Sequence, residues 1–221
     1  MTTAPAPAGD GTWTEIATPA QLTALLGEPH ARAKGKERSA LSAIDRAWLA
    51  AAPFCVMATA DAEGRCDASP KGDPAGSLVH VLDASTIAIA ERPGNKRADG
   101  YRNILANPHV GLNFLIPGRG DTLRINGRAR LVSDAPFFDA MVVKGHRPLL
   151  AVVVEIETVF FHCAKAFLRS RLWKPETWEP DAAVPRRAVI AAELEPSGRT
   201  IEELDAYYAE DSYSRGLYEH Q

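Results

Sequence analysis

Residues 86–114 read TIAIAERPGNKRADGYRNILANPHVGLNF and decide the fold of this chain. The run 86–90 is short, apolar and rich in β-branched residues, which is typical of a strand. The stretch 98–106 reads as a helix, and 109–116 reads as the next strand. A single helix therefore connects two strands, and a turn that is unusually basic for its position precedes that helix.

The basic turn, residues 91–97, places positive charge where a helix begins. It contains the turn signal Pro93-Gly94, and Asn95 is predicted to cap the helix. Its three cations are Arg92, Lys96 and Arg97. A helix N-terminus already carries a partial positive charge, which Asp99 offsets only in part. A bound anion such as phosphate would relieve the conflict; the alternative is a solvated turn whose basic side chains point into water.

A second motif, S-P-K-G-D-P at 69–74, follows the returning strand of a hairpin predicted over 54–69. Its two prolines and one glycine predict a rigid loop whose N–H and C=O groups meet the edge of a ligand. Ser69 and Lys71 would add a hydroxyl and a cation to that edge. The alternative is an ordinary tight turn. The spacing shows no partner for Asp73.

Two further clusters carry positive charge. The strand predicted over 121–132 alternates apolar and polar residues, and its polar face includes Arg124 and Asn126. An exposed strand face is the alternative interpretation, since charges on a strand also deter aggregation. The last cluster combines Lys165, Arg169 and Arg171 with Trp173. An aromatic side chain beside arginines suits stacking on a flat ring, or an ordinary subunit contact.

These elements predict a mainly β fold of the α+β class, with an antiparallel barrel rather than a doubly wound sheet. The predicted barrel occupies residues 51–180, after an N-terminal extension at 1–50 with two short helices. A helical tail is predicted at 181–221, with a capped helix over 196–208. The predicted strands are 54–59, 65–69, 77–82, 86–90, 109–116, 121–132 and 149–163, and a helix is predicted over 136–144.

Composition excludes several classes of protein. The formal net charge of −3 argues against general nucleic-acid binding. The longest clean apolar run, 149–154, is too short to span a membrane, and the first residues do not read as a signal peptide. Three cysteines without a C-x-x-C pair, and histidines without ligand spacing, predict neither a disulfide framework nor a metal site. We therefore expect a cytoplasmic protein without a metal.

Four motifs, in this order, resemble the pyridoxamine 5′-phosphate oxidase-like flavoproteins. They are the S-P-K-G-D-P segment, the R-P-G-N-K-R turn, the T-L-R-I-N-G-R-A strand, and F-F-H-C-A-K-A followed by R-S-R-L-W. The resemblance covers residues 51–178 and is greatest to a subgroup of FMN-dependent proteins rather than to the true vitamin B6 oxidases, whose compact C-terminal segment is replaced here by the tail. It implies a split β-barrel that binds FMN at the interface of a homodimer.

The resemblance also assigns cofactor-binding residues. Asn95, Lys96 and Arg97 fall where these proteins hold the FMN phosphate, with Arg92 beside them. The other implied residues line the flavin ring and the ribityl chain, or reach FMN from the partner subunit. The first group is Ser69, Lys71, Arg124 and Asn126, and the second is Lys165, Arg169 and Trp173.

The function that follows is an FMN-dependent oxidoreductase acting on a small substrate, with no catalytic residue identified. Hydride transfer to or from the flavin needs no protein proton donor, and positive charge near the ring would favour the reduced, anionic flavin. The alternatives are a flavin- or anion-binding module without catalysis, or the same barrel with a deazaflavin. Haem ranks low, because no histidine is evidently placed as an axial ligand.

Overall fold

The computed structural model describes residues 13–31, 35–179, 183–195 and 198–218, and the chain divides into two compact units, 1–36 and 37–221. The described part of the first unit contains helix α1, Pro19–Leu26. The Thr18 side chain accepts a hydrogen bond from the Gln21 N–H, and the Gln21 side chain accepts one from the Thr18 N–H. This capping box begins one of the two short helices predicted in residues 1–50. No residue of α1 is buried.

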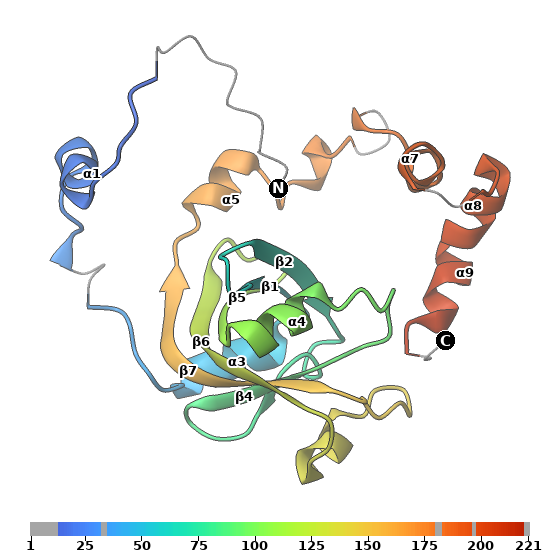
Figure 1. Cartoon of the computed structure of the whole chain (residues 1–221), viewed down its shortest axis with the longest axis horizontal. Coiled ribbons are helices and arrows are strands. Elements are labelled where there is room, and N and C mark those ends of the chain that lie inside the picture. Colours follow the sequence, from blue (N-terminus) through green and yellow to red (C-terminus); the bar gives the residue numbers. More distant parts are fainter. Residues whose placement is uncertain (1–12, 32–34, 180–182, 196–197, 219–221) are drawn as a thin grey trace. The chain divides into compact units, whose positions relative to one another are not determined.

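The second unit is built on a seven-stranded sheet within the described residues, and every pair of neighbouring strands is antiparallel (Figure 1). The strand order is β2-β1-β5-β6-β7-β4-β3. Their bounds are β1 Phe54–Ala60, β2 Cys66–Gly72, β3 His80–Val81, β4 Thr86–Ala90, β5 His109–Leu115, β6 Thr122–Val132 and β7 Ala151–His162. The predicted α+β class with an antiparallel split barrel is confirmed.

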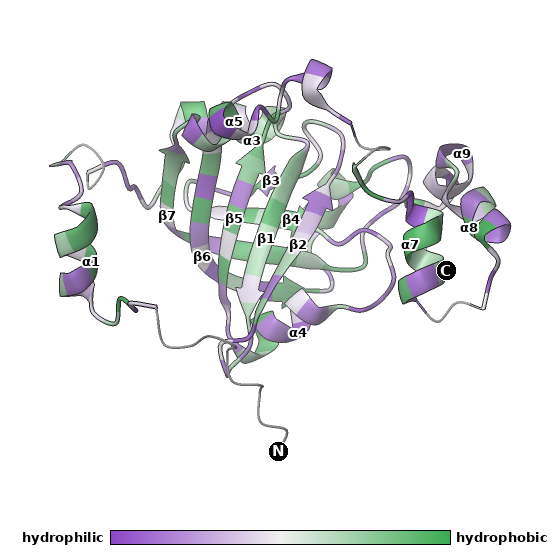
Figure 2. Cartoon of the chain, turned by 90° about the horizontal axis from the view of Figure 1, so that it is seen from above, coloured by the Kyte–Doolittle hydropathy of each residue, from purple (hydrophilic) through white to green (hydrophobic). Residues whose placement is uncertain are grey.

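The alternation predicted for β6 is the pattern that builds the core. Leu123 and Ile125 are fully buried, whereas Arg124 and Arg128 are exposed, because successive strand residues point to opposite faces. Figure 2 shows hydrophilic and hydrophobic residues alternating along β6. The register places Met57 of β1 opposite Leu112 of β5, and the latter opposite Ile125. One face of the sheet therefore forms a continuous apolar core, and the other face carries the polar side chains of β6.

Helix α3, Ala43–Ala51, belongs to this core. Ser42 and Asp45 form a capping box at its N-terminus, and Asp45 is fully buried. Both Asp45 oxygens accept hydrogen bonds from the Arg38 guanidinium. Trp48 and Leu49, in the second half of the helix, are also buried. The cap and the ion pair thus anchor the helix that the sequence predicts here.

Helix α4, Asp99–Ala106, connects β4 to β5 and packs against β1, β2 and β6 (Figure 1). The predicted helix is present, but its predicted cap is wrong. The N-cap position is Ala98, in the left-handed conformation with φ 58°, and Asn95 instead accepts a hydrogen bond of 3.1 Å from the Arg97 N–H. Lys96 also has a left-handed φ of 59°. Two left-handed residues reverse the chain before the helix, so no side chain caps it.

Three other predictions need correction. The segment 69–74 is not a loop throughout, because β2 continues to Gly72 and pairs with β1 up to Phe54. Pro70 is tolerated there because β2 is an edge strand. The strand predicted over 77–82 is only His80–Val81, and the helix predicted over 136–144 is a 3₁₀ helix, η1, at Pro136–Met141.

After β7 the chain forms α5, Lys165–Ser170, and the 3₁₀ turn η2, Pro175–Thr177. The tail contains α7 Arg187–Leu194, α8 Ile201–Tyr208, α9 Glu210–Tyr213 and η3 Ser214–Gly216. The helix predicted over 196–208 begins at Ile201 with Thr200 as its cap; residues 196–197 lie outside the described residues. Helix α7 was not predicted; it packs on α8 through Ala188, Ala191 and Leu204.

Candidate functional site

A cavity of about 900 Å³ lies where β2, the basic turn and the start of α4 meet. We call it the basic-turn pocket. Its lining includes six residues that sequence analysis selected: Ser69, Lys71, Arg92, Asn95, Lys96 and Arg97. The first turn of α4 adds Asp99, Gly100 and Tyr101, so the N–H groups at the start of that helix lie at the same end as the cations.

Lys71 and Ser69 project from one face of β2 because they are two residues apart. The Lys71 amine donates a hydrogen bond of 2.8 Å to the Ser69 hydroxyl and lies 5.7 Å from the centre of the Tyr101 ring. Burial lowers the pKa of Lys71, while Cys55 and Glu91 act in the opposite direction. Burial also raises the pKa of the Cys55 thiol to about 12, so that thiol is neutral at pH 7. The negative charge that favours the Lys71 ammonium at that pH is therefore Glu91.

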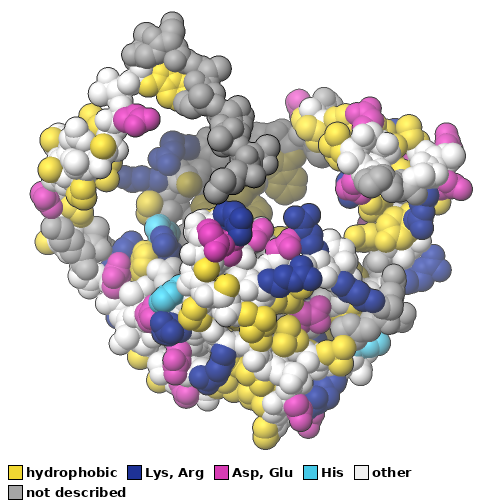
Figure 3. All heavy atoms as spheres, in the orientation of Figure 1, with side chains coloured by type: hydrophobic (Ala, Val, Ile, Leu, Met, Phe, Trp, Pro, Cys, Tyr) yellow, Lys and Arg dark blue, Asp and Glu magenta, His cyan; other side chains and the backbone are white. Residues whose placement is uncertain are grey.

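The basic turn forms the other end of the pocket. The Arg97 side chain is 77% exposed and donates a hydrogen bond to the carboxylate of Asp99, which also lies 3.7 Å from Arg102. Acidic and basic side chains lie next to one another on the face that α4 occupies (Figure 3). Asp99 thus offsets more of the positive charge than sequence analysis allowed, and an anion entering here competes with it for Arg97.

Arg92 lies deeper in the same wall. Its Nε donates to Asp73 at 2.7 Å and its Nη2 donates to the Met141 carbonyl at 2.9 Å. The Arg92 side chain is only 13% exposed, and that of Asp73 only 3%. The sequence showed no partner for Asp73, and the structure supplies two, since Tyr218 donates to its other oxygen at 2.8 Å. Arg92 therefore lines the pocket with its guanidinium already engaged.

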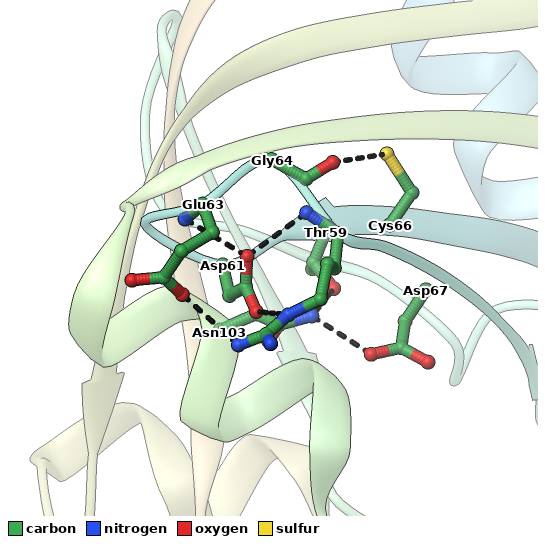
Figure 4. A network of polar contacts seen from close by, with 8 residues as sticks. Thr59, Asp61, Glu63, Gly64, Cys66, Asp67 and Asn103 are labelled. Atoms are coloured by element: carbon green, nitrogen blue, oxygen red, sulfur yellow. Dashed lines mark hydrogen bonds and ion pairs between the residues drawn. The ribbon is translucent and has the colours of Figure 1, made fainter. Parts of the chain in front are cut away.

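A network of polar contacts supports the pocket from the side of the β1–β2 hairpin (Figure 4). The buried Asn103 amide donates hydrogen bonds to Thr59 at 3.1 Å and to Asp67 at 2.8 Å, so α4 is fixed to both strands. Asp61 accepts hydrogen bonds from the Glu63 and Arg65 N–H groups and from the Arg65 guanidinium, which holds the turn. Asp67 lines both the basic-turn pocket and a neighbouring hollow of about 320 Å³.

Five residues selected from the sequence lie away from the basic-turn pocket. Ser69 lies opposite Met57, which is on the core side of the sheet, whereas Arg124 and Asn126 alternate with the core residues of β6 and therefore occupy the other face. There the Arg124 Nε donates to Asn126 at 3.2 Å, and Asn126 donates to Thr158 at 3.1 Å. The remaining three are Lys165 and Arg169 on α5, and Trp173 just after it.

Trp173 does not line the pocket either. Its indole N–H donates to the Arg119 carbonyl at 2.6 Å, and its ring stacks on Phe167 at 5.9 Å. Lys165 and Arg169 are exposed on the short helix α5. In a single chain, then, the residues selected from the sequence form a pocket group and a group that faces elsewhere.

Sequence analysis missed several residues that line the pocket. Tyr101 was part of a recognised helix, and its place one turn after the cations was a usable signal. Asp67 lies two residues before Ser69 on β2, on the same face. Leu217 and Tyr218 come from the tail, and no local pattern connects that segment with the basic turn.

The sequence itself supplies the family. Residues 43–163, more than half of the chain, match the family model of pyridoxamine 5′-phosphate oxidase. The chain belongs to the pyridoxamine 5′-phosphate oxidase family. This match confirms the resemblance inferred from the four motifs, and it begins with α3, the helix that packs in the barrel core.

Among solved structures, this chain is similar to HupZ of Group A Streptococcus, with 18% sequence identity and a TM-score of 0.45. The match covers 55% of this chain and 93% of the HupZ chain. The chain is also similar to the heme storage protein HutZ of Vibrio cholerae, with 14% identity, 53% and 90% covered, and a TM-score of 0.40. No curated protein sequence matches the chain. Family membership rests on the sequence match, since both TM-scores lie below 0.5.

The described residues meet neither the requirements of a metal site nor those of a membrane-spanning helix. Within the residues that the structure describes, no cluster of three or more His, Cys, Asp or Glu side chains is arranged to hold a metal ion. In that same part of the chain, no helix has both the length and the apolar character needed to cross a membrane.

Proposed function

We propose that this chain is an FMN-dependent oxidoreductase whose basic-turn pocket holds the cofactor. The observation that carries the proposal is the composition of that pocket, which joins Lys96 and Arg97 at the start of α4 with Ser69 and Lys71 on β2. Its volume of about 900 Å³ is within the range of cofactor sites. Cations beside a helix N-terminus suit a phosphate, and the hydroxyl and ammonium suit the polar edge of a flavin.

The donors of the pocket fit FMN, with one internal competitor. Of the cations in the wall, Arg92 is already neutralised by Asp73, and Arg97 is shared with Asp99. The Arg97 pair is exposed and therefore weak, so a doubly charged phosphate at the helix N-terminus would take the guanidinium from the carboxylate. The two left-handed residues Lys96 and Ala98 support the same interpretation, because backbone strain in non-glycine residues is concentrated at functional turns.

When bound, FMN would supply the hydride chemistry, and the chain would supply position and charge. Lys71 would lie beside the ring system, where its ammonium stabilises negative charge on a reduced flavin. Its pKa is lowered by burial, so the charge is held in a poorly solvated place where it acts strongly. Replacing Lys71 with Met should therefore lower the reduction potential of the bound flavin, which a spectroelectrochemical titration measures.

The group of residues that faces away from the pocket fits a homodimer. Members of this family are commonly dimeric with a ligand at the interface. Arg124 and Asn126 cannot reach a ligand on the other face of their own sheet, so any contact they make with FMN would come from a second copy. Lys165, Arg169 and Trp173 also lie outside the lining of the pocket, and the family resemblance assigns them to contacts from the partner subunit. Analytical ultracentrifugation with and without FMN tests this part of the proposal, and a monomer that binds FMN fully would contradict it.

The central experiment is a fluorescence titration of the purified protein with FMN, comparing wild type with a Lys96→Ala, Arg97→Ala double variant. Since a hydrogen bond to a charged group is worth about 1.5–3 kcal/mol, affinity should fall at least about 10-fold. Arg187→Ala is the matched control, because Arg187 forms a comparable exposed ion pair with Glu195 in the tail. Equal affinity in the double variant and the control would refute the phosphate site.

Catalysis is tested separately from binding. An FMN-loaded protein that is bleached by NADH or NADPH without oxygen, and regains its colour in air, is an oxidoreductase with those electron donors. A protein that binds FMN at the basic turn but is not reduced by either nucleotide would favour the alternative, a binding module without catalysis. A preparation that binds a deazaflavin in preference to FMN would keep the site and change the cofactor.

A further inference from the structure

The C-terminal segment 214–218 reaches the basic-turn pocket, and Tyr218 forms its polar contact there. Tyr218 donates its hydroxyl hydrogen bond to Asp73 at 2.8 Å, and the same carboxylate accepts from Arg92 at 2.7 Å. Asp73 is almost completely buried, so its interaction with the phenol is shielded from water. A hydrogen bond to a buried charged group is among the stronger polar contacts in proteins.

The Tyr218 ring is held as well as its hydroxyl. The Arg92 guanidinium lies 5.6 Å from the ring centre and the Lys144 amine 5.4 Å, both within range of a cation–π contact. The His146 ring is stacked at 6.2 Å with an angle of 23°. Residues from three separate segments thus surround the Tyr218 side chain, and we call Asp73, Arg92, Lys144 and His146 the tyrosine socket.

The rest of the tail has its own small core. Helices α7 and α8 pack through Ala188, Ala191 and Leu204, with Tyr208 against them, and this cluster is separate from the core of the barrel. Leu217 and Tyr218, in contrast, line the basic-turn pocket together with Leu149 and Leu150. The pocket therefore has a cationic end at the basic turn and a more apolar wall that includes the tail.

We propose that residues 214–218 are a strap over the basic-turn pocket, latched by the Tyr218–Asp73 hydrogen bond, and that its release controls the exchange of molecules in the pocket. The strap forms part of the wall, so a molecule bound beside it is enclosed while the latch is closed. The identity of that molecule as FMN rests on the proposed function; the latch does not. Leu217 and Tyr218 would thereby limit the size of a substrate that shares the pocket with the cofactor.

The test uses the full-length protein without FMN and the variant Tyr218→Phe, which keeps the ring and removes the latch. Chymotrypsin cleaves after Tyr and Phe alike, so mass spectrometry can follow the bond after residue 218 in both proteins. Cleavage there should be about 10- to 100-fold faster in the variant. Tyr213→Phe is the matched control, since Tyr213 lies in the same tail and contacts Tyr207 and Tyr208 rather than the socket.

Closure of the pocket is measured in the same samples by the rate at which trinitrobenzenesulfonate modifies Lys71. We expect faster modification in Tyr218→Phe and an unchanged rate in Tyr213→Phe. Equal cleavage rates in wild type, Tyr218→Phe and Tyr213→Phe would refute the latching role of the Tyr218–Asp73 hydrogen bond. Faster cleavage of Tyr218→Phe with an unchanged rate of Lys71 modification would refute the proposal that the segment covers the pocket. Both measurements omit FMN, so a wild-type protein that fails to bind FMN would overturn the proposed function and leave this test intact.

Discussion

The guanidinium of Arg97 donates a hydrogen bond to the carboxylate of Asp99 two residues later, directly at the start of α4. This pair occupies the cation that we assign to the FMN phosphate. Removing the acid should therefore free the arginine for the cofactor. The consequence is a change in affinity opposite in sign to that of removing Arg97.

We predict that Asp99→Asn binds FMN a few-fold more tightly than wild type at low salt. The increase is modest because exposed ion pairs are weak and screened. The fluorescence titration measures it, with Asp205→Asn in the tail as the control, since Asp205 pairs with Arg186. Weaker binding in Asp99→Asn would mean that the carboxylate holds the turn in its binding conformation rather than competing with the phosphate.

Ala98→Gly should stabilise the protein. A left-handed alanine costs about 1–2 kcal/mol, and the added flexibility of glycine offsets about half of that gain. We expect the free energy of unfolding to rise by about 0.5–1 kcal/mol in urea denaturation. Ala106→Gly, in the last turn of the same helix, should lower it by a similar amount. Equal losses at both positions would argue against strain at Ala98.

Gly127 cannot be replaced by alanine without a large loss of stability. It lies at a register shift between β6 and β7, and an added Cβ would lie 2.0 Å from the Glu155 carbonyl oxygen. Gly127→Ala should lower the free energy of unfolding by about 3 kcal/mol. Gly94→Ala is the control, with open space around its Cβ, and should change it by less than about 0.5 kcal/mol. Similar urea midpoints for both variants would contradict the close approach.

Acid should destabilise the barrel partly through Asp45. Burial alone would raise the pKa of this carboxyl, but hydrogen bonds from Arg38 and Ser42 outweigh burial and hold the pKa below its ordinary value. Its stabilising contribution is therefore complete above the unfolded pKa of about 3.9 and is lost as the pH falls through the lower folded pKa. We expect Asp45→Asn to lower the free energy of unfolding by about 2 kcal/mol at pH 7.

The same variant should also show a flatter dependence of stability on pH below about 4. Asp205→Asn serves as the exposed comparison, because its ion pair with Arg186 lies on the surface. Parallel pH profiles for wild type and Asp45→Asn, measured by thermal unfolding, would show that Asp45 is not the group responsible.

Local patterns in the sequence predicted the elements whose causes are local. The two short helices before the barrel, the alternation along β6 and the helix between β4 and β5 were all evident from a few neighbouring residues. The prediction of Asn95 as the cap failed because two non-glycine residues adopt left-handed backbone, which residue preference does not anticipate. Turn residues at 69–74 likewise concealed a strand that pairing with β1 stabilises.

The missing parts of the site depend on contacts between distant segments. Tyr218 and Asp73 are 145 positions apart, and neither residue has a local pattern that names the other. Arg92 was selected for its charge, but its engagement by Asp73 and the Met141 carbonyl depends on how β4 and η1 fold together. Charge read along the chain thus located the pocket and overstated the number of cations available in it.

The two edges of the sheet carry a consequence for how copies of this chain can associate. On one edge, β2 contains Pro70, which has no N–H to offer to an incoming strand; on the other, β3 is only the two residues His80 and Val81. Both edges are therefore poor templates for adding strands, which protects the sheet from open-ended growth into aggregates. A second copy would have to join through the faces of the barrel, where side chains and not backbone groups decide the fit.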